Sequence, residues 1–401
     1  INQIRIRPKK KKDKSNPVIQ IQFRLVEIEI YPMAMEEAAP EEPQPPMSPE
    51  PVPSQPLSPT TLNDVAHELD LLQDLANKGS WKSILEKVGR ARSNSALSTP
   101  HDHLTYLAFN ALALAKLRRF KDALAELDSL ETLDSHHYRY ETYPKIYPNR
   151  SGSIVPFALR WLHALVPIKL GDRQSGLDRF YILLGFVRGR VGDSRGGEAV
   201  RVWRQREYFV LSCIIGQHVI AKEFGVCLDL IRDSVSRGFY DPAILSKLGF
   251  VQMQIGDLVG AKAMFEQVER LVDDGGDWVL GEVELRNLVG RNTALVYLVG
   301  KDYVSAVRVY EECIQRDPMD VVAVNNKAIC LLYLKDLSDS IKVLEKALER
   351  VPTVALNESL VVNLCSMYEL AYVNHSDIKR TLSNWIAKVA PDDFDSSCTR
   401  I

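Results

Sequence analysis

Two stretches near the C-terminal end of the sequence repeat the same spacing of small, large apolar and terminating residues. The copies end at Pro318 and Pro352, which are 34 positions apart. Small side chains let two antiparallel helices approach closely, larger ones at i and i+4 fill the space between them, and proline ends the second helix. Each copy is therefore predicted to be a helical hairpin. The spaced residues of the first copy, and then their counterparts in the second, are Ala294, Tyr297, Tyr303, Ala306, Tyr310 and Cys313, and Ala328, Leu331, Leu337, Ser340, Leu344 and Ala347.

A single hairpin of this kind cannot bury its own apolar face, so at least about three are expected to stack. Weaker copies begin near Pro242 and Tyr208, and the pattern resembles the tetratricopeptide repeat. The sequence thus predicts an all-α solenoid of seven helical hairpins and a closing segment over residues 61–401. Earlier hairpins are expected within residues 62–88, 104–130 and 161–184, and the clearest repeats at 242–275, 287–320 and 321–354.

The composition of the chain narrows its location and its partners. With 401 residues, 46% of them hydrophobic, and a net charge of -2, the chain is long enough for a continuous core and lacks the basic excess of many nucleic-acid-binding proteins. Its apolar runs fall short of the roughly 18 residues of a transmembrane helix. Its basic first residues do not match a signal peptide. These features predict a cytoplasmic protein that does not bind nucleic acid.

Few patterns in the sequence could support chemistry. The motifs H-E-x-x-H and G-x-S-x-G and the glycine-rich nucleotide loops are missing from it. His136 and His137 are neighbours, but no third ligand stands at a suitable spacing. The sequence therefore predicts no enzyme activity, no cofactor and no metal site. Six cysteines lack C-x-x-C spacing and are predicted to be small core residues: Cys213, Cys227, Cys313, Cys330, Cys365 and Cys398.

Residues 1–60 differ in composition from the repeats. They are first basic and then acidic and rich in proline, which lacks the amide donor that helices need, so we predict a disordered tail. Ser48 and Ser58 each precede a proline and are candidate sites for a proline-directed kinase. Because the chain does not begin with methionine and Met33 opens the acidic segment, residues 1–32 are expected to precede the natural start.

The least repetitive passage, residues 134–156, holds four tyrosines and several prolines, and we name it the tyrosine loop. Such a segment is too apolar to stay free in solvent, and aromatic rings with polar tips suit a half-buried surface. One interpretation is a loop packed back over the first hairpins. The other is that some of its rings contact a partner protein. The candidate residues are Tyr138, Tyr140, Tyr143 and Tyr147.

Asparagines recur at one position of the C-terminal repeats. Asn292 and Asn326 precede Ala294 and Ala328 by two residues, and Asn363 stands in the last copy. This position is expected to face the concave surface of the array. A series of amides there can bond to an extended peptide backbone, because each amide is both donor and acceptor, or it can bond to neighbouring repeats. Both alternatives stay open.

Charged residues suggest two further surfaces. Arg291 and Lys327 adjoin the asparagines, so a clamp for an acidic peptide is possible. Residues 185–206 contain six arginines and few acids, and we expect a flexible basic insertion there. Contact of this insertion with an acidic partner or an anionic membrane is the less favoured alternative.

Three motifs resemble a known family. The passage ETYPKIYPNRSGSIVPFALRWLHALVP, at residues 141–167, resembles the subunit 12 family of the trafficking protein particle (TRAPP) complex. The pattern Asn-Leu-Cys-x-x-Tyr-Glu-Leu at residues 363–370 and the closing Asp-x-Phe-x-x-x-Cys at residues 392–398 are similar to motifs of the same family. The resemblance covers roughly residues 62–401.

The resemblance implies a function for the chain. It implies a non-catalytic scaffold subunit of a tethering and nucleotide-exchange complex that acts on a Rab-family GTPase between endoplasmic reticulum and Golgi. The expected partners are other TRAPP subunits, and the expected location is cytoplasmic and peripheral to those membranes. The alternative is a tetratricopeptide co-chaperone or adaptor that holds an acidic or extended peptide in its concave groove.

Overall fold

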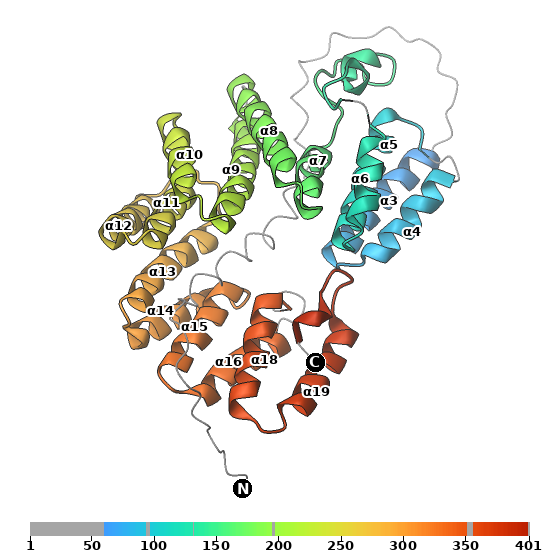
Figure 1. Ribbon diagram of the computed structural model, residues 1–401. Coiled ribbons are helices and arrows are strands. Elements are labelled where there is room, and N and C mark those ends of the chain that lie inside the picture. Colours follow the sequence, from blue (N-terminus) through green and yellow to red (C-terminus); the bar gives the residue numbers. More distant parts are fainter. Residues whose placement is uncertain (1–59, 94–96, 131, 195–196, 351–355, 400–401) are drawn as a thin grey trace. The chain divides into compact units, whose positions relative to one another are not determined.

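The structure is a computed structural model and describes residues 60–93, 97–130, 132–194, 197–350 and 356–399 (Figure 1). The predicted N-terminal tail and its two serine sites lie outside these residues. Within them the elements are helices, joined by loops with a single isolated bridge between Arg139 and Ser153. The predicted all-α arrangement of helical hairpins is confirmed.

The described chain divides into two units. The N-terminal unit extends to Ile214 and includes Pro391–Asp393, and the C-terminal unit contains the rest. The N-terminal unit holds α3 (Thr60–Asn77), α4 (Trp81–Ser93), α5 (Pro100–Lys116), α6 (Phe120–Asp128), η2 (His136–Tyr138), η3 (Tyr140–Thr142), α7 (Phe157–Lys169), α8 (Arg173–Asp193) and most of α9 (Gly197–Ile220). The C-terminal unit holds α10 (Phe224–Ser236), α11 (Pro242–Gln254), α12 (Leu258–Asp274), α13 (Glu282–Val299), α14 (Tyr303–Arg316), α15 (Val321–Tyr333), α16 (Leu337–Arg350), α18 (Glu358–Ala371), α19 (His375–Val389) and η4 (Ser396–Thr399).

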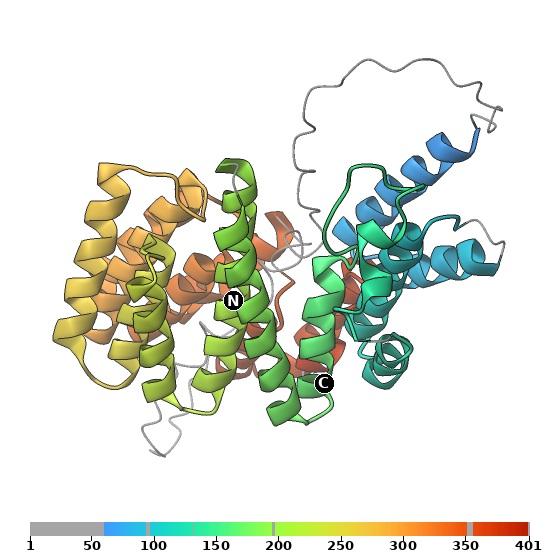
Figure 2. The same cartoon turned by 90° about the horizontal axis from the view of Figure 1, so that it is seen from above.

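Within the C-terminal unit, consecutive helices pack side by side as antiparallel pairs, and Figure 2 shows α11 to α14 in yellow and orange from above. The small residues stand where two helices meet. Ala294, Ala306 and Ala328 are fully buried, and a Cβ added at Gly249 of α11 would lie 2.6 Å from the ring of Phe265 on α12. The spacing seen in the sequence therefore reflects close approach between helices.

Seven of the hairpins turn in the same way. The second residue after the first helix adopts a left-handed backbone. Its amide and that of the next residue donate to carbonyls of that helix, as Lys301 does to Leu298 (3.1 Å) and Asp302 to Tyr297 (2.9 Å). Asp302 then accepts from the amide of Ser305 and caps the second helix. The seven left-handed residues are Gly79, Arg118, Gly171, Lys222, Gly256, Lys301 and Lys335.

At the first of these turns, glycine avoids a steric clash in addition to suiting the left-handed backbone. Pro391–Asp393 belongs to the N-terminal unit, and a Cβ at Gly79 would lie 2.4 Å from Cβ of Pro391. The amide of Asp392 donates to the carbonyl of Gly79 (3.0 Å), and Lys116 pairs with Asp393 (2.6 Å). These bonds attach the segment Pro391–Asp393 to the turn between α3 and α4 and to the end of α5.

The prediction of a flexible basic insertion at residues 185–206 is wrong. Helix α8 continues to Asp193 and α9 begins at Gly197. The carboxylate of Glu207, 1% exposed, lies between Arg188 (3.0 Å) and Arg204 (2.8 Å), and the guanidinium of Arg206 stacks on the ring of Trp203 at 4.6 Å. Pairing with Glu207 offsets part of the repulsion between the arginines, and the ring contact gives the guanidinium of Arg206 an apolar partner, so the segment can be helical.

The cysteines behave as core residues. Five of the six are buried and Cys213 is half-buried, all as free thiols. Burial raises the pKa of Cys227 to about 11 and that of Cys330 to about 12, so the reactive thiolate is disfavoured.

Candidate functional site

The tyrosine loop is an ordered part of the N-terminal unit. Its two ends pair where the amide of Tyr140 donates to the carbonyl of Gly152 (3.0 Å) and that of Ile154 to the carbonyl of Tyr138 (2.8 Å). The carboxylate of Glu141 accepts from the amide of Gly152 (3.0 Å) and pairs with Arg139. The hydrogen bond from Arg139 and those from backbone amides lower the pKa of Glu141 to about 2. The loop is thus a closed turn rather than an open excursion.

Arg160 of α7 anchors this loop to the helices. The guanidinium is only 8% exposed and donates to a carboxylate oxygen of Asp134 (2.9 Å), the carbonyl of Leu133 (3.1 Å) and the hydroxyl of Ser153 (3.0 Å). It also stacks over the ring of Phe186 at 4.1 Å. Burial lowers the pKa of Arg160, and Asp134 opposes this effect. Sequence reasoning missed this residue, although an arginine within the apolar run of α7 was a visible signal.

All four tyrosines are half-buried. The hydroxyl of Tyr147 accepts from the amide of His101 in the first turn of α5 (3.1 Å), and the ring of Tyr140 lies edge-on to that of Tyr147 at 5.0 Å. The loop therefore packs on the second hairpin, as the first interpretation stated. Its tip remains exposed, and Ile146 is 46% exposed. Contact of Tyr138, Tyr143 and their neighbours with a partner stays a prediction.

The three asparagines bond within the protein. Asn292, 6% exposed, accepts from the hydroxyl of Ser246 in the preceding repeat (2.9 Å). Asn326, 4% exposed, donates to the hydroxyl of Tyr310 (3.3 Å). Asn363 is half-buried and donates to the side chain of Asn325 in the preceding repeat (2.7 Å). Bonds between repeats, one of the two alternatives, are present, and peptide binding stays a prediction.

The cations beside the asparagines are also paired. Arg291 bonds to Asp320 (2.7 Å), and Lys327 bonds to Glu311, whose pKa this contact lowers. Asp320 in turn accepts from the amide of Asn287 (2.9 Å), a fully buried residue that sequence reasoning missed. A peptide carboxylate would have to compete with these internal partners.

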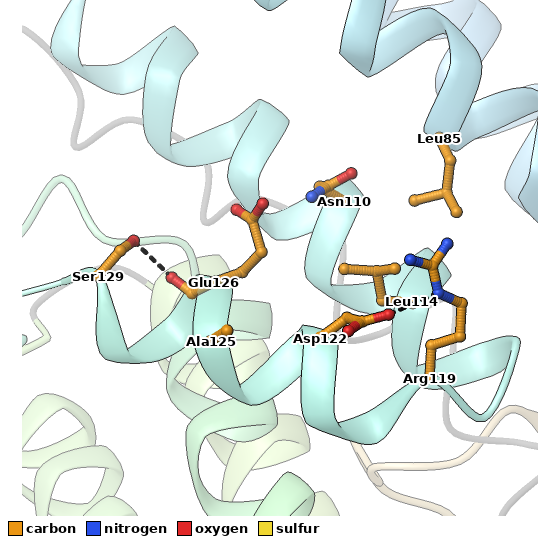
Figure 3. Close-up of a pocket in the computed structure, with 8 residues that line it drawn as sticks. All are labelled: Leu85, Asn110, Leu114, Arg119, Asp122, Ala125, Glu126 and Ser129. Atoms are coloured by element: carbon orange, nitrogen blue, oxygen red, sulfur yellow. Dashed lines mark hydrogen bonds and ion pairs between the residues drawn. The ribbon is translucent and has the colours of Figure 1, made fainter.

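One cavity of about 500 Å³ lies between α4, α5 and α6 of the N-terminal unit (Figure 3). Leu114 and the amide of Asn110 project into it from α5. At its rim, Arg119 pairs with Asp122 (2.7 Å). The remaining lining residues are Leu85, Ala125, Glu126 and Ser129.

No group of three or more histidine, cysteine, aspartate or glutamate side chains in the described part of the chain is placed to hold a metal ion. None of the described helices combines the length and apolarity needed to cross a membrane. Exposed side chains are found at the tip of the tyrosine loop and at the turns between helices.

Comparison with known proteins extends the resemblance seen in the sequence. Trafficking protein particle complex subunit 12 of Homo sapiens is 30% identical over 358 residues, which cover 82% of this chain and 48% of the human protein. The chain is a relative of subunit 12. The same subunit of Mus musculus is 31% identical over 360 residues, covering 82% of this chain and 44% of the mouse protein. The chain therefore spans about half the length of the curated relatives it matches, and no family model matches it.

Solved structures with similar helical arrays share little sequence with the chain. One, described as NprR in complex with its cognate peptide NprX, is 13% identical, covers 79% of this chain and 94% of its own, and has a TM-score of 0.42. Another, the Cut9-Hcn1 hetero-tetramer of APC/C, is 13% identical, covers 72% and 52%, and has a TM-score of 0.33. At these TM-scores neither likeness bears on partners or ligands.

Proposed function

We propose that the chain is the helical-repeat part of a TRAPP complex subunit and acts as a scaffold without chemistry of its own. The observation that supports this most is the identity to subunit 12 along most of the chain. In this proposal, nucleotide exchange on a Rab-family GTPase belongs to other subunits. The chain would be cytoplasmic and peripheral to membranes between endoplasmic reticulum and Golgi.

The test of this function is affinity purification of the tagged full chain from cells, followed by identification of the recovered proteins. Recovery of TRAPP subunits in defined amounts supports the proposal. Recovery of chaperones without them contradicts it and favours the adaptor alternative.

The tyrosine loop is the first surface that we propose for contact with a partner. Its exposed tip is presented by a turn that Glu141 closes and Arg160 anchors, so little conformational entropy is lost when a partner binds. Half-buried tyrosines are frequent in binding surfaces, because each ring supplies apolar area and its hydroxyl a polar end.

Replacing Tyr143 and Tyr147 together by alanine is expected to weaken association with the other subunits and to leave helical content intact. The matched control replaces both by phenylalanine, which removes the hydroxyls, including the acceptor for the amide of His101, and keeps the rings. Co-purification that is unchanged in the alanine variant would exclude the loop from the interface. Circular dichroism checks that the helices are retained.

A second candidate function is a peptide-binding adaptor, and one observation favours it. The amide nitrogen of Asn292 has no hydrogen-bond partner among the described residues, although its side chain is buried. A buried donor of this kind is usually satisfied in native proteins. Titration of the full chain with a labelled acidic pentapeptide at two salt concentrations tests this function, and the absence of saturable binding would remove it.

A further inference from the structure

Exposed apolar side chains recur at the turn between the two helices of each hairpin in the C-terminal unit, and three others, Tyr240, Val283 and Met319, stand at the connections between hairpins. Solvent exposure of the residues at the turns ranges from 40% at Leu334 to 91% at Val373. A turn needs no large apolar side chain for its own geometry, and polar residues are the usual choice there. We call the set at the turns the apolar edge, and its members are Ile220, Ile255, Val259, Val304, Leu334 and Val373.

The members of the apolar edge lie along one side of the stack. In an array of hairpins, the turns at equivalent positions are aligned, because each hairpin packs on the next in the same orientation. One ring contact shows this alignment directly. Tyr303, just after the turn between α13 and α14, stacks on Tyr333, just before the turn between α15 and α16, with ring centres 4.9 Å apart and planes within 7°. This contact brings the turns of two successive hairpins side by side, and the regular stacking of hairpins places the exposed side chains of the other turns in the same row.

The equivalent turns of the N-terminal unit provide an internal comparison. The turn between α5 and α6 carries the exposed Arg118 and Arg119, and that between α3 and α4 carries polar residues beside Asp392. Leu170, 38% exposed, is the large apolar residue at the turn between α7 and α8. The same backbone geometry therefore accepts charged residues. The apolar side chains of the C-terminal unit are not a requirement of the fold.

The backbone of these turns favours one kind of occupant. The amides of Lys222, Gly256, Lys301 and Lys335 already donate to carbonyls of the preceding helix, and Asp257 and Asp302 cap the following helices. An extended peptide, which needs backbone partners at a sheet edge or in a groove, has little to bond to there. A helix satisfies its own backbone and needs only an apolar surface.

Charge narrows the occupant further. Each lysine of these turns is followed directly by a carboxylate: Glu223 after Lys222, Asp302 after Lys301 and Asp336 after Lys335. An anionic membrane is attracted by clusters of cations, and alternating charges cancel beyond about 8–10 Å at physiological salt. The turns therefore carry no excess of cations, and their exposed apolar side chains match the apolar face of an amphipathic protein helix.

We propose that the apolar edge docks an amphipathic helix of another subunit of the complex, an inference that rests on the proposed function. Neighbouring helices lie about 8–10 Å apart and each hairpin has two, so a partner helix of about 20 residues, roughly 30 Å long, reaches at least two successive turns. Its apolar residues would recur at i, i+3, i+4 and i+7.

The first experiment compares two variants of the tagged full chain for recovery of TRAPP subunits. Val259→Ser combined with Val304→Ser changes two residues that are 83% and 67% exposed, so the fold and its thermal midpoint should be unchanged. Recovery should fall at least about tenfold, as for residues central to an interface. The control, Leu170→Ser, also replaces an exposed apolar residue by serine, at a turn of the N-terminal unit, and should recover TRAPP subunits as the wild type does.

A photo-reactive residue in place of Val304 then identifies what lies on the apolar edge. Cross-links to a helical segment of another subunit, with apolar residues at the spacing above, support the proposal. Cross-links to an extended segment or to a second copy of the chain overturn it. Binding to phosphatidylserine–phosphatidylcholine vesicles that is lost in the serine variant also overturns it.

The outcomes separate this inference from the function on which it rests. If the wild type recovers no TRAPP subunit, the proposed function fails and the inference fails with it. If the wild type recovers them and the double serine variant recovers as much, the function stands and the apolar edge is not the docking surface.

Discussion

Arg160→Met should loosen the tyrosine loop and destabilise the N-terminal unit. The substitution keeps the apolar stem of the side chain and removes the guanidinium with its three hydrogen bonds, to Asp134, Leu133 and Ser153. Each bond to a charged donor contributes about 1.5–3 kcal/mol when it is broken in a buried site. The carboxylate of Asp134 is 73% exposed and regains water, so the full sum is not lost. We expect a net loss of about 2–4 kcal/mol in the free energy of unfolding.

Hydrogen exchange at two amides measures this effect locally. The amides of Tyr140 and Ile154 close the loop, and both should exchange about thirtyfold faster or more, which corresponds to about 2 kcal/mol. Thermal unfolding should shift by about 2–4 °C for each kcal/mol in a unit of this size. The matched control is Arg150→Met, because Arg150 is exposed and lies over the ring of Tyr140 at 5.8 Å without anchoring the loop ends.

The exchange rates of the loop amides in the two variants show whether Arg160 holds the loop. If the loop amides exchange no faster in Arg160→Met than in Arg150→Met, Arg160 does not hold the loop. The rigid presentation that we propose for Tyr143 and its neighbours would then lose its physical basis.

Two further predictions concern the packing between helices and the effect of low pH on the tyrosine loop. Gly249→Ala should destabilise the C-terminal unit by about 1–2 kcal/mol, because the added methyl meets the ring of Phe265. Gly216→Ala in α9, with nothing within 4 Å of the new Cβ, should stabilise by about 0.5–1 kcal/mol. Denaturant titrations in which both substitutions change the free energy of unfolding in the same direction would contradict the packing at Gly249. The carboxylate of Glu141 contributes its full stabilisation above the ordinary pKa of 4.5, and this contribution is lost as pH falls towards about 2. The amide resonance of Gly152 should therefore shift with a midpoint near pH 2, and it should show no such shift in Glu141→Gln.

The hairpins could be predicted from the sequence because their packing depends on local spacing. Ala294, Ala306 and Tyr310 recur at intervals that place them on one face of consecutive helices, and all three are fully buried. Such a pattern is readable without knowing any contact between distant residues.

The arginine-rich segment could not be read in the same way. A count of charges in residues 185–206 omits Glu207, which follows the segment and lies between two of its arginines, and it omits the rings on which others stack. The same limit applies to the candidate site. Arg160 holds residues that are up to 27 positions away, and Asn292 bonds to Ser246 in another repeat, so sequence identified the asparagine position but not its partner.

The left-handed turn residues are positions where a substitution can make the protein more stable. Four of the seven turns place a lysine or arginine where the backbone suits glycine, and that conformation costs an ordinary residue about 1–2 kcal/mol. Part of this cost is offset because glycine loses more conformational freedom on folding. Exchanging Arg118 for glycine would relieve strain in the N-terminal unit without touching the apolar edge. A protein prepared in this way could be concentrated and imaged with its binding surfaces unaltered.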